Sequence, residues 1–140
     1  MVEIRMRYEG DLHCVSVHGP SGTDLATDAP VDNQGRGESY SPTDLVATAL
    51  GTCMLTTMGI VARKNGWNMN GASASVEKSM VADPVRRIAK LEVKVRMPEV
   101  LDEAARKTLE QTAETCPVQK SISSAIQVPI EFEWGATSSS

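Results

Sequence analysis

Apolar and polar residues alternate at the start of the chain in a way that predicts a β-hairpin. Every second residue from Val2 to Tyr8 is apolar and the residues between them are charged, which is the period of a half-buried strand. Glu9-Gly10-Asp11 supplies a turn, and a second strand is expected through Val17. Residues 19–40 are rich in glycine, proline and small polar residues, so we expect mostly loop there, with one short strand near residues 23–27.

The residues from Ser41 to Asp44 predict the start of a long helix. Serine is a good N-cap, proline suits the first helical position, and an acidic residue stabilises the first turn. The helix is expected to run to about Lys64, where Asn65-Gly66 supplies the stop. It would be roughly 35 Å long, and it is apolar or small on nearly every face. Such a helix must be covered all round, so we expect a second subunit to help cover it.

The 18 residues from Leu45 to Ala62 carry no charge, which meets the lower length limit for a membrane span. The stretch nevertheless holds four threonines and two glycines. It also lies inside an otherwise soluble sequence. We therefore interpret it as a buried core helix and expect no membrane partner.

Two strands and an amphipathic helix are expected next. The strands cover about residues 72–80 and 87–97 and are joined around Asp83-Pro84. One face of the second strand is apolar and the other is charged, which is typical of an antiparallel sheet with one wet face. The apolar face comprises Ala89, Leu91, Val93, Val95 and Met97. The helix that follows has an inner stripe comprising Leu101, Ala105, Leu109, Thr112 and Cys116.

The chain is expected to close with a short helix and an edge strand. Pro117 opens a helix that runs to about Ala125. The last strand has an apolar face comprising Ile126, Val128, Ile130, Phe132 and Trp134. Pro129 favours an edge position for this strand. We interpret residues 1–134 as a single α+β domain and residues 135–140 as a flexible C-terminal tail.

Composition and charge exclude several classes of function. The 140 residues, of which 41% are hydrophobic and 23% charged, are typical of one globular domain and not of a disordered chain. Fourteen basic residues against eighteen acidic ones give a net charge of −4 without a basic block, so no nucleic-acid partner is expected. The N-terminus lacks the apolar stretch of a signal peptide, which favours a cytoplasmic location.

Three cysteines are the main candidates for chemistry. Cys14, Cys53 and Cys116 are odd in number and form no CxxC or Cys/His cluster, so neither a disulfide framework nor a zinc site is indicated, and no cofactor is expected. Each could be a buried structural residue, the commonest fate of a free cysteine. Cys116, however, precedes a predicted helix, whose positive end favours a thiolate. Both histidines, His13 and His18, lie on the N-terminal hairpin, and nothing in the sequence brings them to a cysteine.

Three motifs resemble those of the OsmC/Ohr family of thiol peroxidases, in its divergent OsmC-like branch. The segment from Ser41 to Cys53 resembles the helix that carries the first active cysteine of that family. Cys116-Pro117-Val118 resembles its second-cysteine motif, and Tyr8-Glu9-Gly10-Asp11 is similar to an aromatic-Glu-Gly-Asp turn of OsmC proteins. The order of the expected elements fits the family over essentially the whole chain.

The resemblance implies an OsmC-like fold, with antiparallel sheets around long central helices, formed as an intertwined homodimer. It also implies that Cys53 is the peroxidatic thiolate, which attacks an organic hydroperoxide and becomes a sulfenic acid. Cys116 would then form a disulfide with Cys53. An external dithiol, in the family often a lipoylated protein, would reduce that disulfide.

A peroxidatic thiolate in these surroundings needs a positive charge. A thiol beside the apolar residues Leu50, Met54 and Met58 requires a nearby cation to ionise near neutral pH. The family uses an arginine from the N-terminal region, which is steadied by a glutamate directly after the proline of the helix start. Thr43 stands at the position of that glutamate in this chain.

Arg36, in the glycine-flanked loop before the helix, is the candidate for this cation. Glu38 or Asp44 is the expected carboxylate partner of Arg36, in place of the glutamate that the chain lacks. Arg5, Arg7 or a residue from a partner subunit are the alternative sources of charge.

Two classes of function are consistent with these features. The first is a cysteine-based peroxidase acting on organic hydroperoxides. The second is a non-catalytic OsmC-like module for stress response, redox sensing or binding, in which the cysteines pack or sense. The two classes of function are distinguished by whether Cys53 and Cys116 both lose their thiols when the protein reacts with an organic hydroperoxide.

Overall fold

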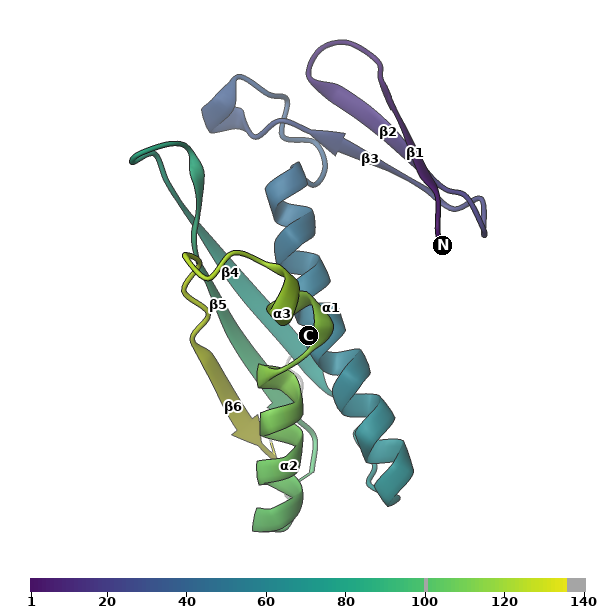
Figure 1. The fold of residues 1–140 in the computed structure, drawn as a ribbon, viewed down its shortest axis with the longest axis vertical. Coiled ribbons are helices and arrows are strands. Elements are labelled where there is room, and N and C mark those ends of the chain that lie inside the picture. Colours follow the sequence, from purple (N-terminus) through teal and green to yellow (C-terminus); the bar gives the residue numbers. More distant parts are fainter. Residues whose placement is uncertain (100, 136–140) are drawn as a thin grey trace. The chain divides into compact units, whose positions relative to one another are not determined.

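The computed structural model describes residues 1–99 and 101–135 and shows an α+β fold with two three-stranded sheets (Figure 1). In chain order the elements are β1 (Ile4–Tyr8), β2 (His13–His18), β3 (Asp24–Asp28), the 3-10 helix η1 (Val31–Asn33), α1 (Pro42–Asn65), β4 (Ser73–Val81), β5 (Arg87–Met97), α2 (Glu103–Glu114), α3 (Pro117–Ser121) and β6 (Ile130–Trp134). The chain divides into two compact units, residues 1–46 and 47–140. Most of the predicted tail, residues 136–140, lies outside the described residues.

The first unit contains an antiparallel sheet in the order β1-β2-β3. Tyr8 pairs with Cys14 at the hairpin end, and Gly10 in the turn has a φ of +92°, which glycine adopts readily. The predicted hairpin and the short strand, now β3, are therefore confirmed. His13 on β2 pairs with Asp28 on β3, so that their side chains lie on the same face.

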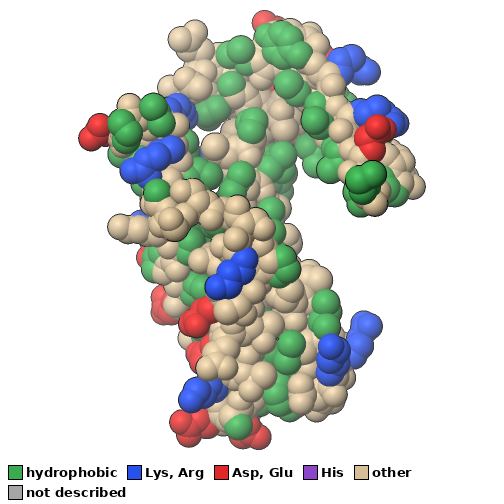
Figure 2. All heavy atoms as spheres, viewed as in Figure 1, with side chains coloured by type: hydrophobic (Ala, Val, Ile, Leu, Met, Phe, Trp, Pro, Cys, Tyr) green, Lys and Arg blue, Asp and Glu red, His purple; other side chains and the backbone are tan. Residues whose placement is uncertain are grey.

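The apolar face of β1 is exposed, and the expectation of a half-buried strand is wrong for the single chain. The exposed fractions are 64% for Val2, 50% for Ile4, 68% for Met6 and 63% for Tyr8. The alternation is present, but the described residues of one chain leave this face open to solvent. Figure 2 shows hydrophobic side chains that reach the surface of this unit. A contiguous apolar surface on a folded chain indicates a binding face.

Helix α1 begins and ends where the sequence predicts. The Ser41 hydroxyl accepts the backbone N–H of Asp44 at 3.1 Å, and the Asp44 carboxylate accepts the N–H of Ser41 at 2.9 Å. This reciprocal pair is a capping box, which satisfies two backbone donors at the helix start. The helix ends at Asn65, and Gly66 follows with a φ of +71°.

One side of α1 is buried within its own chain. The buried residues recur every three or four positions and are Ala47, Leu50, Gly51, Met54, Met58 and Ala62. Among the described residues, α1 is the one helix long and apolar enough to span a membrane by length and composition, and 33% of its most apolar window is buried. The helix that the sequence expects to be covered all round is thus only partly covered by one chain.

The second unit contains a sheet in the order β4-β5-β6, with α1 and α2 on one of its faces (Figure 1). Strand β5 has the predicted bounds, and its buried residues include Leu91, Val93, Val95 and Met97. The predicted inward position of Ala89 is wrong, and Ile88 is buried instead. The register between β4 and β5 shifts between Ser79 and Met80, and such a bulge inserts one extra residue and reverses the alternation beyond it.

Strand β6 lies at the edge of this sheet, as Pro129 predicts. It pairs with β5 in parallel, however, so the expectation of antiparallel pairing is wrong for this pair. The reason is the long crossover through α2 and α3, which returns the chain to the sheet in the same direction as β5.

The two C-terminal helices follow the predicted order with small differences. Asp102 caps α2 by accepting the N–H of Ala105 at 2.8 Å. The buried stripe of α2 contains Ala113 and not the predicted Thr112. Helix α3 is shorter than expected and ends at Ser121.

Candidate active site

Cys53 and Cys116 lie together in the second unit. Cys53 is carried by α1, and Gly51 two residues earlier lies so close to β4 that a Cβ there would be 3.1 Å from the Val76 side chain. The helix therefore packs tightly on the sheet where it presents the cysteine. Cys116 is the N-cap of α3, and the Cys53 side chain lies close enough to raise the pKa of the Cys116 thiol. Both residues are free thiols.

The two thiols differ in their access to solvent and in their environment. Cys116 is 1% exposed, whereas Cys53 is half-buried. Burial raises the pKa of the Cys116 thiol. The Gln119 backbone N–H, which donates to Cys116 Sγ at 3.4 Å, lowers that pKa, and the Cys53 side chain raises it further.

The expectation that the helix start makes Cys116 a thiolate is therefore wrong. Helix α3 has five residues, so its dipole is small, and burial outweighs the favourable amide contact at Sγ. Because its pKa is raised above the ordinary value of a thiol, Cys116 stays protonated at neutral pH. Cys53 is the more accessible sulfur of the pair.

Arg36 lies in the first unit and pairs with a carboxylate that sequence reasoning missed. Its guanidinium is 3.7 Å from the carboxylate of Asp28, whose side chain is 1% exposed. His13 Nδ1 contacts the same oxygen at 2.6 Å. A buried carboxylate requires partners, and arginine and histidine share that role here.

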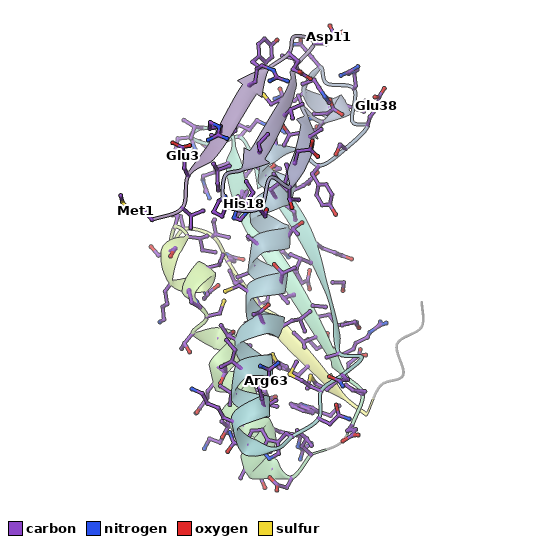
Figure 3. All side chains as sticks on the ribbon, turned by 90° about the vertical axis from the view of Figure 1, so that its right-hand side faces the viewer. Met1, Glu3, Asp11, His18, Glu38 and Arg63 are labelled. Carbon is purple, nitrogen blue, oxygen red and sulfur yellow. The ribbon has the colours of Figure 1, made fainter. Side chains whose placement is uncertain are left out.

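The two predicted partners of Arg36 have other surroundings. Glu38 is exposed, and Figure 3 shows its side chain pointing outward. Asp44 accepts the N–H of Ser41 in the helix cap. Asp28 gives no signal in the sequence, because an aspartate at the end of a short polar strand is normally exposed. Only the pairing of β2 with β3 places it beside His13.

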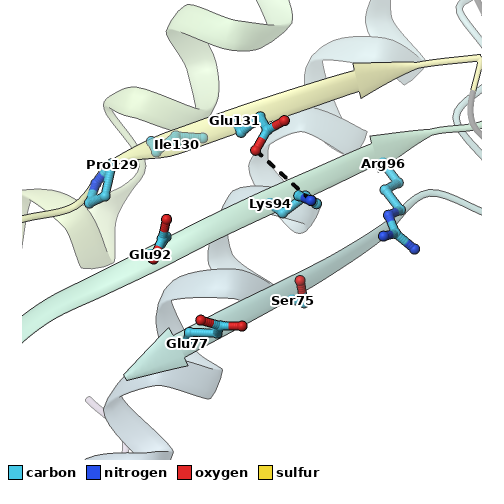
Figure 4. Close-up of a pocket in the computed structure, with 8 residues that line it drawn as sticks. All are labelled: Ser75, Glu77, Glu92, Lys94, Arg96, Pro129, Ile130 and Glu131. Carbon is cyan, nitrogen blue, oxygen red and sulfur yellow. Dashed lines mark ion pairs between the residues drawn. The ribbon is translucent and has the colours of Figure 1, made fainter. Parts of the chain in front are cut away.

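A charged groove of about 480 Å³ is lined by all three strands of the second sheet (Figure 4). Lys94 in this groove lies 3.9 Å from the carboxylate of Glu131 and 3.4 Å from that of Glu133. Within residues 1–99 and 101–135, no group of three or more histidine, cysteine, aspartate or glutamate residues is arranged to hold a metal ion. The groove is a solvated face of paired charges, and the thiol pair is the candidate active site.

Comparison with known proteins identifies related chains. A family model described as OsmC-like protein matches residues 35–131. No curated protein matches the chain. The structure of a proposed osmotic stress induced and detoxification response protein from Psychrobacter arcticus is similar with 43% sequence identity and a TM-score of 0.89, over 94% of this chain and 96% of that one.

Two solved structures with lower identity share the fold. The organic hydroperoxide resistance protein OsmC from Legionella pneumophila is 18% identical with a TM-score of 0.75, over 95% of this chain and 96% of that one. The organic hydroperoxide resistance protein OhrB of Bacillus subtilis is 16% identical with a TM-score of 0.70, over 95% of this chain and 98% of that one. The predicted α+β fold class is therefore confirmed.

Proposed function

Because the chain belongs to the OsmC-like family, we propose that it is a cysteine-based peroxidase that reduces organic hydroperoxides. The observation that carries this proposal is that the Cys53 thiol lies close enough to the Cys116 thiol to raise its pKa. Two free cysteines that are distant in sequence and close in the fold are placed to form a reversible disulfide. Related proteins named for organic hydroperoxide resistance share the fold and suggest the substrate class.

The difference between the two sulfurs assigns their roles. The half-buried Cys53 is the peroxidatic residue, since a peroxide from solution reaches it first. Its thiolate attacks the terminal oxygen of R–O–O–H, the O–O bond breaks, and Cys53 becomes a sulfenic acid while RO⁻ takes a proton from water. Cys116 is protected by burial and protonation until that sulfenic acid forms beside it.

The second half of the cycle restores both thiols. Cys116 condenses with the sulfenic acid of Cys53 to form a disulfide and release water. An external dithiol, of the kind found on a lipoylated protein, then reduces the disulfide by exchange and is itself oxidised. This cycle needs no cofactor.

Consumption of an organic hydroperoxide by the purified protein tests the proposal. With dithiothreitol as the reductant, the protein should consume many equivalents of cumene hydroperoxide per chain. A rate equal to that of dithiothreitol alone would reject the enzyme and favour the sensing or binding module.

We also propose that the active form is an intertwined homodimer. One chain buries only part of the apolar α1 and leaves the apolar face of β1 exposed. A second copy that covered both surfaces would bury the area that one chain cannot. The apolar composition of these surfaces favours a stable interface of the kind found in obligate dimers.

Light scattering tests this assembly. At micromolar concentration we expect a mass of twice the chain mass of 15.0 kDa. Met6→Glu places a charge in the exposed apolar face of β1 and should shift the mass toward one chain. The control Arg5→Gln changes the net charge equally on the opposite face of the strand and should leave the dimer intact. A wild-type mass near that of one chain would refute the dimer.

We further propose, on the resemblance to the family alone, that the charge of Arg36, which pairs with Asp28 in the first unit, favours the Cys53 thiolate. The thiolate is the form that iodoacetamide alkylates, so Arg36→Met should slow alkylation of Cys53 at pH 7 by about tenfold. Arg63→Met, at the exposed end of α1, is the matched control and should react like the wild type. An unchanged pH profile for Arg36→Met would remove Arg36 from this role and point to Arg5, Arg7 or the partner subunit.

A further inference from the structure

A groove of about 590 Å³ lies at the C-terminal end of α1, within the second unit, and is called the α1-end groove below. One wall is formed by the last turns of α1 and the other by the loop that follows, residues 66–70. Gly66, with a φ of +71°, reverses the chain, and the Trp67 N–H donates to the Ala62 carbonyl at 2.9 Å. The loop is thereby held against the helix end, and the volume between them is typical of a small-molecule site.

The α1-end groove contains space that the chain does not fill, at Gly59. A Cβ built there would meet nothing within 4 Å beyond the adjacent residues and the helix backbone. Because glycine weakens a helix relative to alanine, no contact among the described residues explains a glycine at this position. Ile60 beside it is 51% exposed, and the half-buried Trp67 and Met69 also line the groove. The groove therefore combines an apolar lining with room for a further group.

The polar residues of the groove offer hydrogen-bond donors. Among the described lining residues Arg63, in the last turn of α1 (Figure 3), alone is charged, and it makes no ion pair within residues 1–99 and 101–135. Asn68 Oδ1 accepts the N–H of Asn70 at 2.9 Å, so the Asn68 amide presents its NH₂ group. A guanidinium and an amide donor beside apolar side chains match a ligand with an anionic head and an apolar body.

We propose that the α1-end groove binds a free organic acid, that is, a carboxylate with an apolar body. Arg63 and Asn68 bind the carboxylate, and the hydrocarbon part occupies the space beside Gly59 and Ile60. This site does not depend on the proposed peroxidase function. A second copy of the chain is the competing occupant, since Ile60 lies on the exposed side of α1. Charged residues are depleted in the buried core of a dimer interface, so the free charge of Arg63 favours the anionic ligand.

Isothermal titration calorimetry of the full chain with octanoate tests the assignment. We expect saturable binding of one octanoate per chain, and weaker binding of 1-octanol, which has the same hydrocarbon chain without the charge. Arg63→Met should weaken the binding of octanoate by about fivefold, the upper range for an exposed ion pair. Lys64→Met removes the same charge from the next residue, which does not line the groove, and should bind octanoate like the wild type.

Filling the groove tests where the ligand lies. Gly59→Leu should abolish the binding of octanoate, because its side chain occupies the proposed position of the hydrocarbon. Gly59→Ala adds only a Cβ, which meets nothing, so it should retain the affinity. It should also raise the melting temperature, since alanine is the better helix former. If Gly59→Leu does not fold, the comparison of Arg63→Met with Lys64→Met decides.

Several results would overturn the assignment. These are the absence of saturable binding, equal affinities for octanoate and 1-octanol, and equal effects of Arg63→Met and Lys64→Met. Wild-type affinity in Gly59→Leu would place the ligand elsewhere and would overturn it as well. Light scattering identifies the competing occupant, because a fall in mass to that of one chain in Gly59→Leu would show that a second copy fills the groove.

Discussion

Replacing Cys53 with serine is expected to abolish the consumption of organic hydroperoxide. A serine hydroxyl is not ionised near neutral pH, so it cannot attack the O–O bond as a thiolate does. Cys116 does not take over, because it is 1% exposed and burial raises the pKa of its thiol. The loss should therefore be at least a thousandfold, on the order of what removal of a catalytic nucleophile costs.

The measurement is the rate of cumene hydroperoxide loss with dithiothreitol in excess. Cys14→Ser is the matched control, since Cys14 lies on β2 in the other unit and has no role in the cycle. It should retain the wild-type rate. Substantial activity in Cys53→Ser would show that another residue attacks the peroxide.

Replacing Cys116 with serine should limit the protein to roughly one turnover. Without the second thiol, the sulfenic acid of Cys53 cannot form the internal disulfide and persists or is oxidised further. Serine is itself a favourable N-cap, so it can accept the Gln119 N–H that Cys116 accepts now. Helix α3 should therefore keep its start, and the effect isolates the chemistry of the sulfur.

Mass spectrometry after one equivalent of peroxide checks this result. Cys116→Ser should gain the mass of one or more oxygen atoms on Cys53, whereas the wild type should lose two hydrogens as the disulfide forms. In the turnover assay, Cys116→Ser is supplied with a dithiol that reduces sulfenic acids slowly, because direct reduction of the Cys53 sulfenic acid would replace the role of Cys116. Multi-turnover activity equal to the wild type would rule out Cys116 as the resolving residue.

Local signals in the sequence predict most of the secondary structure. The capping residues from Ser41 to Asp44 and the stop at Gly66 locate α1, because caps act through a few neighbouring backbone groups. Period-two alternation locates β1 and β5, because this pattern too is carried by residues that are neighbours in the sequence. The bulge at Ala89 and the parallel pairing of β6 depend on contacts between distant segments, so no local pattern encodes them.

The exposed face of β1 shows a second feature that the sequence does not predict, namely which chain covers an apolar face. Alternation in a sequence indicates that one face of a strand will be covered, but it does not say whether the cover belongs to the same chain. The face of Ile4 and Met6 is apolar as predicted and is open in the single chain. The same holds for the half of α1 that its own chain leaves uncovered.

The candidate site is predictable only in part. Motif resemblance selects Cys53 and Cys116, and the structure places the Cys53 thiol close enough to raise the pKa of Cys116. The state of Cys116 is not predictable from its position before Pro117, because burial depends on the packing of the whole unit. The Asp28 partner of Arg36 likewise emerges only from tertiary structure.

The most direct test of the two-cysteine cycle is a thiol titration of the reduced protein before and after one equivalent of organic hydroperoxide, with no reductant present. The chain has three free cysteines. The cycle predicts that two thiols per chain are lost together, that Cys14 remains, and that a peptide map links Cys53 to Cys116. Three titratable thiols after treatment, or a loss that does not involve Cys53, would contradict it.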